Sequence, residues 1–253
     1  MQADPRHVVS VITVVRNDAA GLSRTLDSVA RQKRHLLEQI VIDGGSTDDT
    51  RRVLDERRTD IDVLLAEPDD GIYSGMNKGL DRASCDWVLF LNAGDRFASD
   101  NAIEQIVSAT AADVDVIYSD VLFDAPGGPR LSACDVRLRR FHHQAICYRR
   151  SLHDRFGRYV VGHGVTISDY IFLQSIAELR WRKLPQPLAI CDATGQSSRP
   201  RAYYQKLAVD LIFGTKGRVQ VALMLLAYPF YRWLVRPIID ALPRSRTGKR
   251  KPS

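Results

Sequence analysis

Apolar runs of strand length alternate with segments of helical periodicity over the first half of the chain. Runs of this kind, bounded by turn residues, are typical of parallel strands covered on both faces. Their alternation with helices favours a parallel sheet with right-handed crossover connections. The sequence therefore predicts an α/β fold with a mostly parallel sheet flanked by helices. The predicted strands are 8–15, 38–42, 61–66, 87–91 and 114–121, and the predicted helices are 22–31, 50–57, 72–80 and 102–109.

Polar clusters follow three of the predicted strands. Because open α/β sheets bind ligands beyond the carboxyl ends of their strands, we expect these clusters to converge on one crevice. Asp95, just past a buried strand, is a candidate ligand-binding carboxylate, and Asn77 and Lys78 lie off the apolar stripe of their helix. The alternative interpretation is a surface helix followed by a core strand and a polar turn. The three clusters are 16–17, 43–44 and 92–95.

The pattern loosens in the second half of the chain, where shorter elements are expected. We predict one domain over 1–200 and a C-terminal helical extension with a basic tail over 201–253. The expected elements are a hairpin turn at 124–129, an edge strand at 141–148, a helix opening at 168–170, a strand pair within 180–191, a polar loop at 195–198, and helices from 202 onward broken at Pro229 and Pro237.

Composition places the chain among globular proteins. Its 253 residues are 45% hydrophobic, enough for one substantial core or one core with a small appendage. The first seven residues are polar, and no signal peptide is indicated. The four cysteines form no Cys-x-x-Cys pair, so neither a structural zinc site nor a disulfide framework is expected. A reducing cytosol is the expected location.

The net charge of +6 is concentrated in the last segment of the chain. An apolar, aromatic stretch at 219–235 precedes these basic residues, and Pro229 and Arg232 interrupt it before it reaches the ~20 residues that a spanning helix needs. We therefore expect an interfacial helix at the inner face of the plasma membrane, with a basic tail that favours anionic lipids. The alternative is a pair of helices packed on the main domain. No nucleic-acid partner is expected.

Several short motifs occur in a set order along residues 8–200. The motifs are SVITVVRN at 10–17, VIDGGSTD at 41–48, EPDDGIY at 67–73, MNKG at 76–79, FLNAGD at 90–95, His143-Gln144, and SDY at 168–170. This ordered set resembles the large family-2 glycosyltransferases with the GT-A fold, a Rossmann-like architecture for nucleotide-diphosphate sugars. It is most similar to small bacterial enzymes that build capsular, exopolysaccharide or glycolipid sugars.

The resemblance implies a role for each matching position. Asp95, together with Asn92, occupies the region that carries a divalent metal, Mn²⁺ or Mg²⁺, and Asp169 stands where the family has its catalytic base. The donor is expected to be a UDP-, GDP- or dTDP-sugar. The residues expected to bind it are Thr13, Val15, Arg16, Asp43, Asp69, Gly71, Asn77, Lys78, Asn92 and Ala93.

Two positions depart from the family pattern. The strand end reads Asn-Ala-Gly-Asp, which leaves Asp95 as the single carboxylate for the metal. Ser74 stands where many relatives have Asp, a change that bears on the choice of sugar. Structural alternatives also remain for two carboxylates, since Asp169 could cap its helix and Asp43 could be a turn residue. His143 is interpreted as structural and is not among the predicted catalytic residues.

The predicted activity follows from the chemistry of glycosyl transfer. A hard cation stabilises the leaving diphosphate, and one base deprotonates the acceptor hydroxyl. One base without a second carboxylate nucleophile predicts inversion at the anomeric carbon. The expected acceptor is a lipid-linked, glycolipid or polysaccharide hydroxyl. The alternative is a non-catalytic glycosyltransferase-like subunit of a polysaccharide or glycolipid assembly complex.

Two other enzyme classes lack their sequence signals. A sugar-nucleotide pyrophosphorylase requires a glycine-rich first loop, which residues 16–18 do not provide. A dinucleotide oxidoreductase requires Gly-x-Gly-x-x-Gly after the first strand, and this motif is absent.

Overall fold

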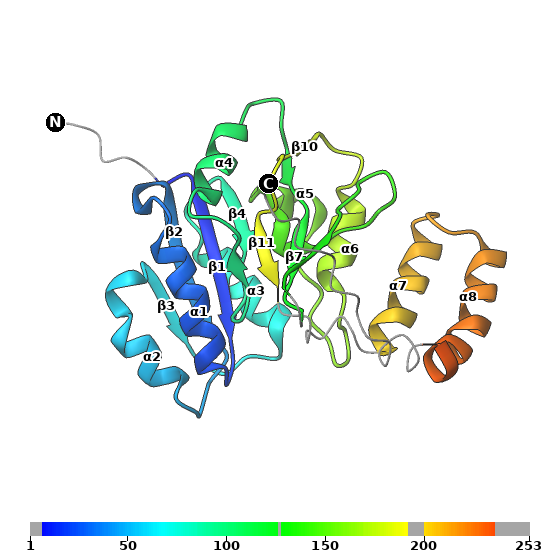
Figure 1. The fold of residues 1–253 in the computed structure, drawn as a ribbon, viewed down its shortest axis with the longest axis horizontal. Helices are drawn as coiled ribbons and strands as arrows, with labels where there is room; N and C mark the ends of the chain where they lie inside the picture. The colour runs from blue at the N-terminus through cyan, green and yellow to red at the C-terminus, as the bar shows by residue number, and fades with distance from the viewer. Residues whose placement is uncertain (1–6, 126–127, 192–199, 236–253) are drawn as a thin grey trace, which may run out of the picture.

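The computed structural model describes residues 7–125, 128–191 and 200–235, and Figure 1 shows their arrangement. A seven-stranded sheet forms the centre, in the order β10-β6-β9-β4-β1-β2-β3. All neighbouring pairs are parallel except β4 with β9 and β9 with β6, so the predicted mostly parallel α/β sheet is confirmed. The strands are β1 (Val9–Val15), β2 (Leu37–Asp43), β3 (Val63–Ala66), β4 (Trp87–Phe90), β6 (Val116–Tyr118), β9 (Ile146–Arg149) and β10 (Trp181–Lys183).

Helices cover both faces of this sheet, and β1 is therefore buried on both sides. On one face, Leu22 and Leu26 of α1 pack on Val41. On the other face, Met76 and Leu80 of α3 pack against β1 and β2. The first face carries α1 (Ala19–Ala30), α2 (Thr50–Glu56) and α4 (Ala102–Ala109), and the second carries α3 (Ile72–Arg82), α5 (Leu152–Phe156) and α6 (Ser168–Ser175).

Helix α3 approaches β1 unusually closely, because two of its residues are glycines. A Cβ atom on Gly79 would lie 2.4 Å from the Cγ2 atom of Ile12, and one on Gly75 would lie 2.7 Å from Val14 Cγ1. Side chains at these positions would push the helix off the sheet. The glycines therefore fix where the start of α3 lies relative to the end of β1.

A second, four-stranded sheet packs beside the first, in the order β5-β11-β7-β8. Phe97, Val121 and Cys191 of this sheet share a core with α4 and β1. The sheet brings residue 191 next to the segment that follows β4, because β11 pairs with β5. Its strands are β5 (Arg96–Phe97), β7 (Val121–Phe123), β8 (Arg130–Ser132) and β11 (Ala189–Cys191).

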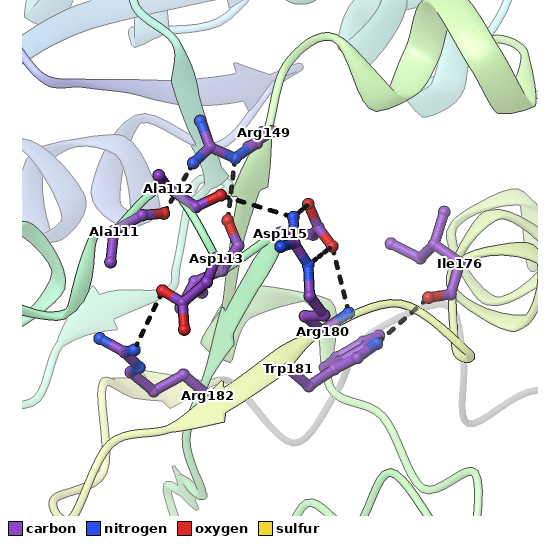
Figure 2. Close-up of polar contacts among 10 residues, drawn as sticks. Ala111, Ala112, Asp113, Asp115, Arg149, Ile176, Arg180, Trp181 and Arg182 are labelled. Carbon is purple, nitrogen blue, oxygen red and sulfur yellow. Dashed lines mark hydrogen bonds and ion pairs between the residues drawn. The ribbon is translucent and has the colours of Figure 1, made fainter.

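Arginines hold the edge strand β10 against β6, as Figure 2 shows. The Nε atom of Arg180 lies 2.9 Å from Asp115 Oδ2, and this hydrogen bond holds the pKa of the Asp115 carboxyl below its usual range against the opposing effect of burial. Arg149 of β9 donates to the carbonyl oxygens of Val114 and Ala111, in the segment that precedes β6. These contacts lie away from the cavity described below and stabilise the sheet edge.

Two C-terminal helices, α7 (Pro200–Ile212) and α8 (Arg218–Phe230), form a hairpin at one end of the molecule (Figure 1). Tyr203 and Tyr228 stack between them with ring centroids 3.7 Å apart. Val209 and Ala202 of α7 pack with Ile167, and the tyrosine at position 170 borders the same cluster. Among the described residues, no helix is long and apolar enough to cross a membrane.

Several predicted elements differ from the observed ones. The predicted edge strand 141–148 is wrong: β9 lies inside the sheet between β4 and β6, and His143–Ala145 form a 3₁₀ turn. The predicted strand 114–121 is two strands, β6 and β7, in different sheets, and the predicted pair within 180–191 is likewise divided between the two sheets. Local periodicity does not report which strands pair, and pairing between distant segments decides each of these points.

The predicted helix break at Pro229 is also wrong. Pro229 lies in the last turn of α8, and a π-helical turn, Tyr231–Val235, follows it. A proline removes one backbone donor, and a wider turn accommodates the loss where the helix is about to end. The predicted polar loop 195–198 and the break at Pro237 lie outside the described residues.

Candidate active site

One cavity of about 670 Å³ lies at the carboxyl end of β4, between two groups of residues that are far apart in the sequence. The first group, the N-terminal wall, consists of cavity-lining residues before position 100. The second group, the C-terminal wall, consists of lining residues after position 120. The N-terminal wall includes Asp18, residues 70–73, Met76, Asn92, Ala93 and Asp95; the C-terminal wall includes Phe123, residues 141–144, residues 162–167, Asp169, Tyr170, Leu173, Arg201 and Lys206.

The turn after β4 carries Asn92 and Asp95 into the cavity, and a buried threonine of α1 holds this turn. The hydroxyl oxygen of Thr25 lies 2.6 Å from the Asp95 carbonyl oxygen and 3.1 Å from the Gly94 amide nitrogen. It also lies 3.3 Å from the Asn92 carbonyl oxygen. Gly94 has a φ of 95°, which a glycine adopts without strain. One side chain thus organises the backbone of the whole turn.

The oxygen atoms at this turn fit a hard divalent cation. The side-chain oxygen Oδ1 of Asn92 is buried and has no hydrogen-bond partner among the described residues. The Asp95 carboxylate lines the same cavity, and the buried Cys191 thiol hydrogen bonds to it. Carboxylate and amide oxygens are ligands that Mg²⁺ and Mn²⁺ accept, with further positions left for substrate phosphates. In the described part of the chain, no group of three His, Cys, Asp or Glu side chains forms a complete metal site.

Asp169 lies near the start of α6, in the C-terminal wall, and faces the turn after β4. Its Oδ1 atom accepts a hydrogen bond from the Tyr73 hydroxyl at 2.6 Å, and its Oδ2 atom lies 2.8 Å from His143 Nδ1. The Nε2 atom of His143 in turn lies 3.4 Å from Asn92 Nδ2. The carboxylate and the imidazole are each about one-fifth exposed (21% and 18%), so both remain accessible from the cavity. Asp169, Tyr73, His143 and Asn92 therefore form a continuous polar chain across the cavity.

The cluster keeps Asp169 ionised. Burial alone would raise the pKa of this carboxyl, but the hydrogen bond and charge of His143, together with the Tyr73 hydroxyl, lower it to about 2. Burial is the largest single effect on the pKa of His143 and would lower it, but the hydrogen bond to Asp169 and the charges of Asp169 and Asp95 together outweigh burial, so the pKa is raised. Burial, reinforced by the Asp169 carboxylate, raises the pKa of Tyr73 well above its ordinary value, and Tyr73 remains a hydrogen-bond donor.

Five of the predicted site residues meet at the cavity, and the others have partners elsewhere. Those that line it are Gly71, Asn92, Ala93, Asp95 and Asp169. Thr13 is fully buried, and its hydroxyl donates to the Leu91 carbonyl oxygen at 2.8 Å. Asp43 is also buried and accepts a hydrogen bond from the Ser46 amide at 3.0 Å.

Three further predicted residues surround the strand ends without lining the cavity. The Val15 carbonyl oxygen accepts from the Gly44 amide at 2.9 Å, and Arg16 is exposed next to it. Asp69 caps the turn before α3, where its Oδ1 atom accepts from the Gly71 amide. Their contacts to a nucleotide remain predictions.

Two residues of α3, Asn77 and Lys78, are engaged by the protein itself. The Asn77 side chain makes two hydrogen bonds to the backbone of Tyr159, at 2.9 and 3.1 Å. Lys78 Nζ lies 2.8 Å from the Pro68 carbonyl oxygen and 2.9 Å from Glu67 Oε1. In this arrangement both side chains brace α3, and their predicted place beside the donor phosphates remains a prediction.

Sequence reasoning did not identify several residues of the site. His143 was assigned a structural role, although its position in the ordered motifs was a usable signal. Tyr73 lies in the matched segment 67–73, but nothing in its spacing indicated a bond to residue 169. Thr25, Arg201 and Lys206 carried no sequence signal, since a buried threonine and two helical cations are common in any α/β protein.

The fold and the cavity define the class of protein. The arrangement matches solved GT-A glycosyltransferases: TarS of S. aureus, in complex with UDP-GlcNAc, has a TM-score of 0.67 at 18% identity, covering 85% of this chain and 68% of that one. A mannosyltransferase from Pyrobaculum calidifontis, in complex with GDP-Man and Mn²⁺, has a TM-score of 0.65 at 18% identity, covering 95% and 78%. At this identity the likeness establishes the fold.

Sequence comparison supplies the family. The profile of glycosyl transferase family 2 matches residues 10–158, and the chain belongs to this family. The PGL/p-HBAD biosynthesis glycosyltransferase of Mycobacterium bovis (strain BCG / Pasteur 1173P2) is 34% identical over 176 residues, covering 64% of this chain and 67% of its own length. The protein is thus a glycosyltransferase, and the predicted family and fold are confirmed.

Proposed function

We propose that this enzyme transfers a sugar from a nucleoside-diphosphate sugar to a hydroxyl group of a lipid-linked, glycolipid or polysaccharide acceptor, with inversion. The observation that carries the proposal is that Asp169 faces the Asn92–Asp95 turn across one cavity. A base on one side and cation-binding oxygens on the other are what displacement at an anomeric carbon requires. The solved neighbours hold UDP-GlcNAc and GDP-Man, which supports a nucleotide-sugar donor.

The proposed reaction is a single displacement. The acceptor oxygen attacks the anomeric carbon as its proton passes to the Asp169 carboxylate. The bond between the anomeric carbon and the phosphate oxygen breaks, and the nucleoside diphosphate leaves with the electron pair. Because the pKa of Asp169 is lowered to about 2, this base is ionised at neutral pH. His143 and Tyr73 orient it, each through one carboxylate oxygen.

A divalent cation, Mn²⁺ or Mg²⁺, would be held by the Asp95 carboxylate and Asn92 Oδ1, with the donor diphosphate completing its coordination. When bound, it neutralises the charge that develops on the leaving diphosphate. Thr25 contributes by fixing the turn on which both oxygen ligands lie. The solved mannosyltransferase binds Mn²⁺, which supports the choice of a divalent cation.

The test of this proposal combines binding and turnover. UDP, GDP and dTDP, each with and without Mn²⁺, are first compared by thermal shift, and the best is titrated calorimetrically. We expect Asp95→Ala to abolish the metal-dependent part of nucleotide binding and to abolish nucleotide-sugar turnover. Asp100→Ala, which removes a surface carboxylate paired with Arg31 away from the cavity, serves as the control. Unchanged metal-dependent affinity in Asp95→Ala would contradict the proposal.

We also propose that the enzyme acts as a peripheral protein at the inner face of the plasma membrane. Five apolar side chains repeat at intervals of four and three along α8 and the π-helical turn that follows it, and all are exposed; Leu226 is 78% and Trp233 84% exposed. Such a stripe, followed in the sequence by a basic segment, favours the surface of an anionic bilayer. The stripe consists of Val219, Leu223, Leu226, Phe230 and Trp233.

Sedimentation with vesicles tests the membrane proposal. The full chain should sediment with vesicles rich in anionic lipid at low salt, and the double variant Leu223→Asp/Leu226→Asp should not. Gln220→Asp is the control, because it adds the same negative charge at an exposed position outside the stripe. Sedimentation of the double variant equal to wild type would show that the stripe does not bind lipid.

A further inference from the structure

Helix α7 forms part of the cavity, although it is the first of the C-terminal helices. The Gln205 side chain anchors it to the loop at 162–167: Oε1 accepts from the Thr166 amide and hydroxyl, at 3.1 and 2.7 Å, and Nε2 donates to the Gly164 carbonyl oxygen at 2.7 Å. The buried Asp210 anchors it to α6, since its carboxylate accepts from the Tyr170 hydroxyl at 2.6 Å. These bonds fix which α7 side chains face the cavity.

Two cations of α7, Arg201 and Lys206, line the cavity from this position. Lys206 Nζ lies over the ring of Tyr170, 5.2 Å from its centroid, and the side chain is half-buried. The Arg201 guanidinium lies against Gly164, whose Cβ, if present, would be 2.5 Å from Nη1. The loop glycine thus leaves room for the guanidinium at the cavity wall.

Lys206 differs from the other lysines in the described ranges. Each of the other four lies within 4 Å of a carboxylate oxygen, as Lys78 does with Glu67 and Lys216 with Asp210. Neither Lys206 nor Arg201 forms such a pair within residues 7–125, 128–191 and 200–235. Two cations that form no ion pair within 4 Å with a described carboxylate, and that line the cavity, are suited to an anionic group of a bound substrate.

The position of these cations indicates which substrate carries the anion. Both cations belong to the C-terminal wall, as Asp169 does. Lys206 lies over the ring of Tyr170, the residue after Asp169 in α6. The proposed cation ligands belong to the N-terminal wall. An anion held at Lys206 would therefore lie beside Tyr170, the neighbour in the chain of the group that would receive the acceptor proton.

We propose that Arg201 and Lys206 form an anion subsite that binds a phosphate or carboxylate group of the acceptor. This inference rests on the proposed function, because it assumes that Asp169 marks the acceptor side. The acceptor class is then a sugar or lipid-linked sugar that carries a negative charge close to the hydroxyl that is glycosylated. The two aromatic rings beside the subsite, Tyr170 and Phe141, would pack against the apolar face of that sugar.

The test uses simple probes in place of the unidentified acceptor. Glucose 6-phosphate, glucuronic acid and glucose are titrated calorimetrically into the enzyme saturated with Mn²⁺ and its best nucleoside diphosphate. We expect the two anionic probes to bind more tightly than glucose, and Lys206→Met to weaken their binding roughly tenfold, as for loss of one charge-assisted hydrogen bond. Lys206→Arg should retain most of the affinity. Arg218→Met, which removes an exposed charge of the same hairpin outside the cavity, should leave it unchanged.

Other outcomes would overturn the inference. If the nucleoside diphosphate blocks the anionic probes, and Lys206→Met weakens binding of the nucleotide itself, the cations belong to the donor diphosphate. If glucose 6-phosphate binds no better than glucose, or if Lys206→Met and Arg201→Met bind it like wild type, no anion subsite exists. Nucleotide binding by the wild-type enzyme tests the proposed function separately, since Lys206→Met is expected to leave that affinity intact.

Discussion

The N-terminal wall of the cavity is held at the end of β4 by an uncharged hydroxyl, whereas the C-terminal wall is held by charged side chains. At the end of β4, a single hydroxyl, that of Thr25, organises the turn through backbone atoms. Across the cavity, Asp169 is held by His143 and Tyr73, and Asp210 holds Tyr170. The position of the turn at the end of β4 therefore depends on one uncharged side chain, whereas the ionisation of Asp169, the proposed base, depends on the charge and the hydrogen bonds around it.

The difference predicts separate effects on binding and on turnover. Asp169→Asn removes the ionised carboxylate, the proposed base, but retains the shape of the side chain and its place in α6. We expect turnover to fall by roughly 10²–10⁴-fold, the usual contribution of a general base, while nucleotide affinity stays close to wild type. Steady-state kinetics and calorimetry on the same preparation measure both quantities. Turnover near the wild-type value would show that Asp169 has only a structural role at the start of α6.

The two walls also differ in how well the sequence predicts them. Asn92 and Asp95 follow a buried strand in a regular strand–helix unit, so their position at the sheet edge follows from local pattern. The contact between His143 and Asp169 depends on β9 inserting between β4 and β6, and no local pattern shows that pairing. Interpreted as an edge strand, the segment around His143 does not predict that this residue lies beside Asp169.

The C-terminal helices show the same limit. Their periodicity predicted helices from 202 onward, which α7 and α8 confirm. Periodicity alone did not show that the face carrying Arg201 and Lys206 lines the cavity, since this depends on the Gln205 and Asp210 hydrogen bonds. Likewise, Asn77 and Lys78 lie off their apolar stripe as expected, but they bond to the backbone of Tyr159 and Pro68. A polar position on a helix predicts exposure, and tertiary contacts decide its partner.

The second prediction concerns the core beneath the C-terminal wall. His153 is 4% exposed, stacks on Phe172 with ring centroids 4.1 Å apart, and bonds to the Tyr148 hydroxyl and the Gly157 carbonyl oxygen. Burial lowers its pKa from 6.5 to about 4. The unfolded chain therefore binds a proton that the folded protein excludes as the pH falls below 6.5. The free energy of unfolding therefore keeps the full contribution of neutral His153 above pH 6.5, and loses it progressively as the pH falls to about 4.

We expect this histidine alone to reduce the free energy of unfolding by about 3 kcal/mol over that range. Urea unfolding at pH 7, 5.5 and 4.5 measures it. His153→Gln should be less stable at pH 7 but should lose less stability on acidification. The exposed His35→Gln should keep the wild-type slope. An equal slope in wild type and His153→Gln would contradict the prediction.

The third prediction concerns the N-terminal wall. Thr25→Val preserves the shape of the side chain but leaves the Gly94 amide and the Asp95 carbonyl oxygen without their partner. We expect a loss of about 1–3 kcal/mol in the free energy of unfolding, the cost of buried groups left unsatisfied. Metal-dependent nucleotide binding should weaken as well, because the turn carries both proposed cation ligands. Thr25→Ser, which retains the hydroxyl, should recover most of both. If Thr25→Val is destabilised but binds the nucleotide with wild-type metal dependence, the turn held by Thr25 does not carry the cation ligands.

The smallest expected effect concerns Tyr73, the side chain that joins the two walls. Tyr73→Phe removes only the hydroxyl that donates to Asp169 Oδ1 at 2.6 Å, while the ring keeps its packing beside Tyr159. A hydrogen bond to a carboxylate stabilises the ionised form, so its loss should raise the pKa of Asp169 from about 2 by about one to two units. Since the ionised carboxylate is the proposed base, the acid limb of the rate–pH profile should move to higher pH by the same amount. Turnover near pH 7 should change little, because Asp169 remains ionised there. The rate–pH profile from pH 2 to 8 is the measurement, and unfolding is followed over the same range so that a loss of activity caused by unfolding is recognised. A profile identical to wild type would show that Tyr73 only packs, and that His143 alone sets the ionisation of Asp169.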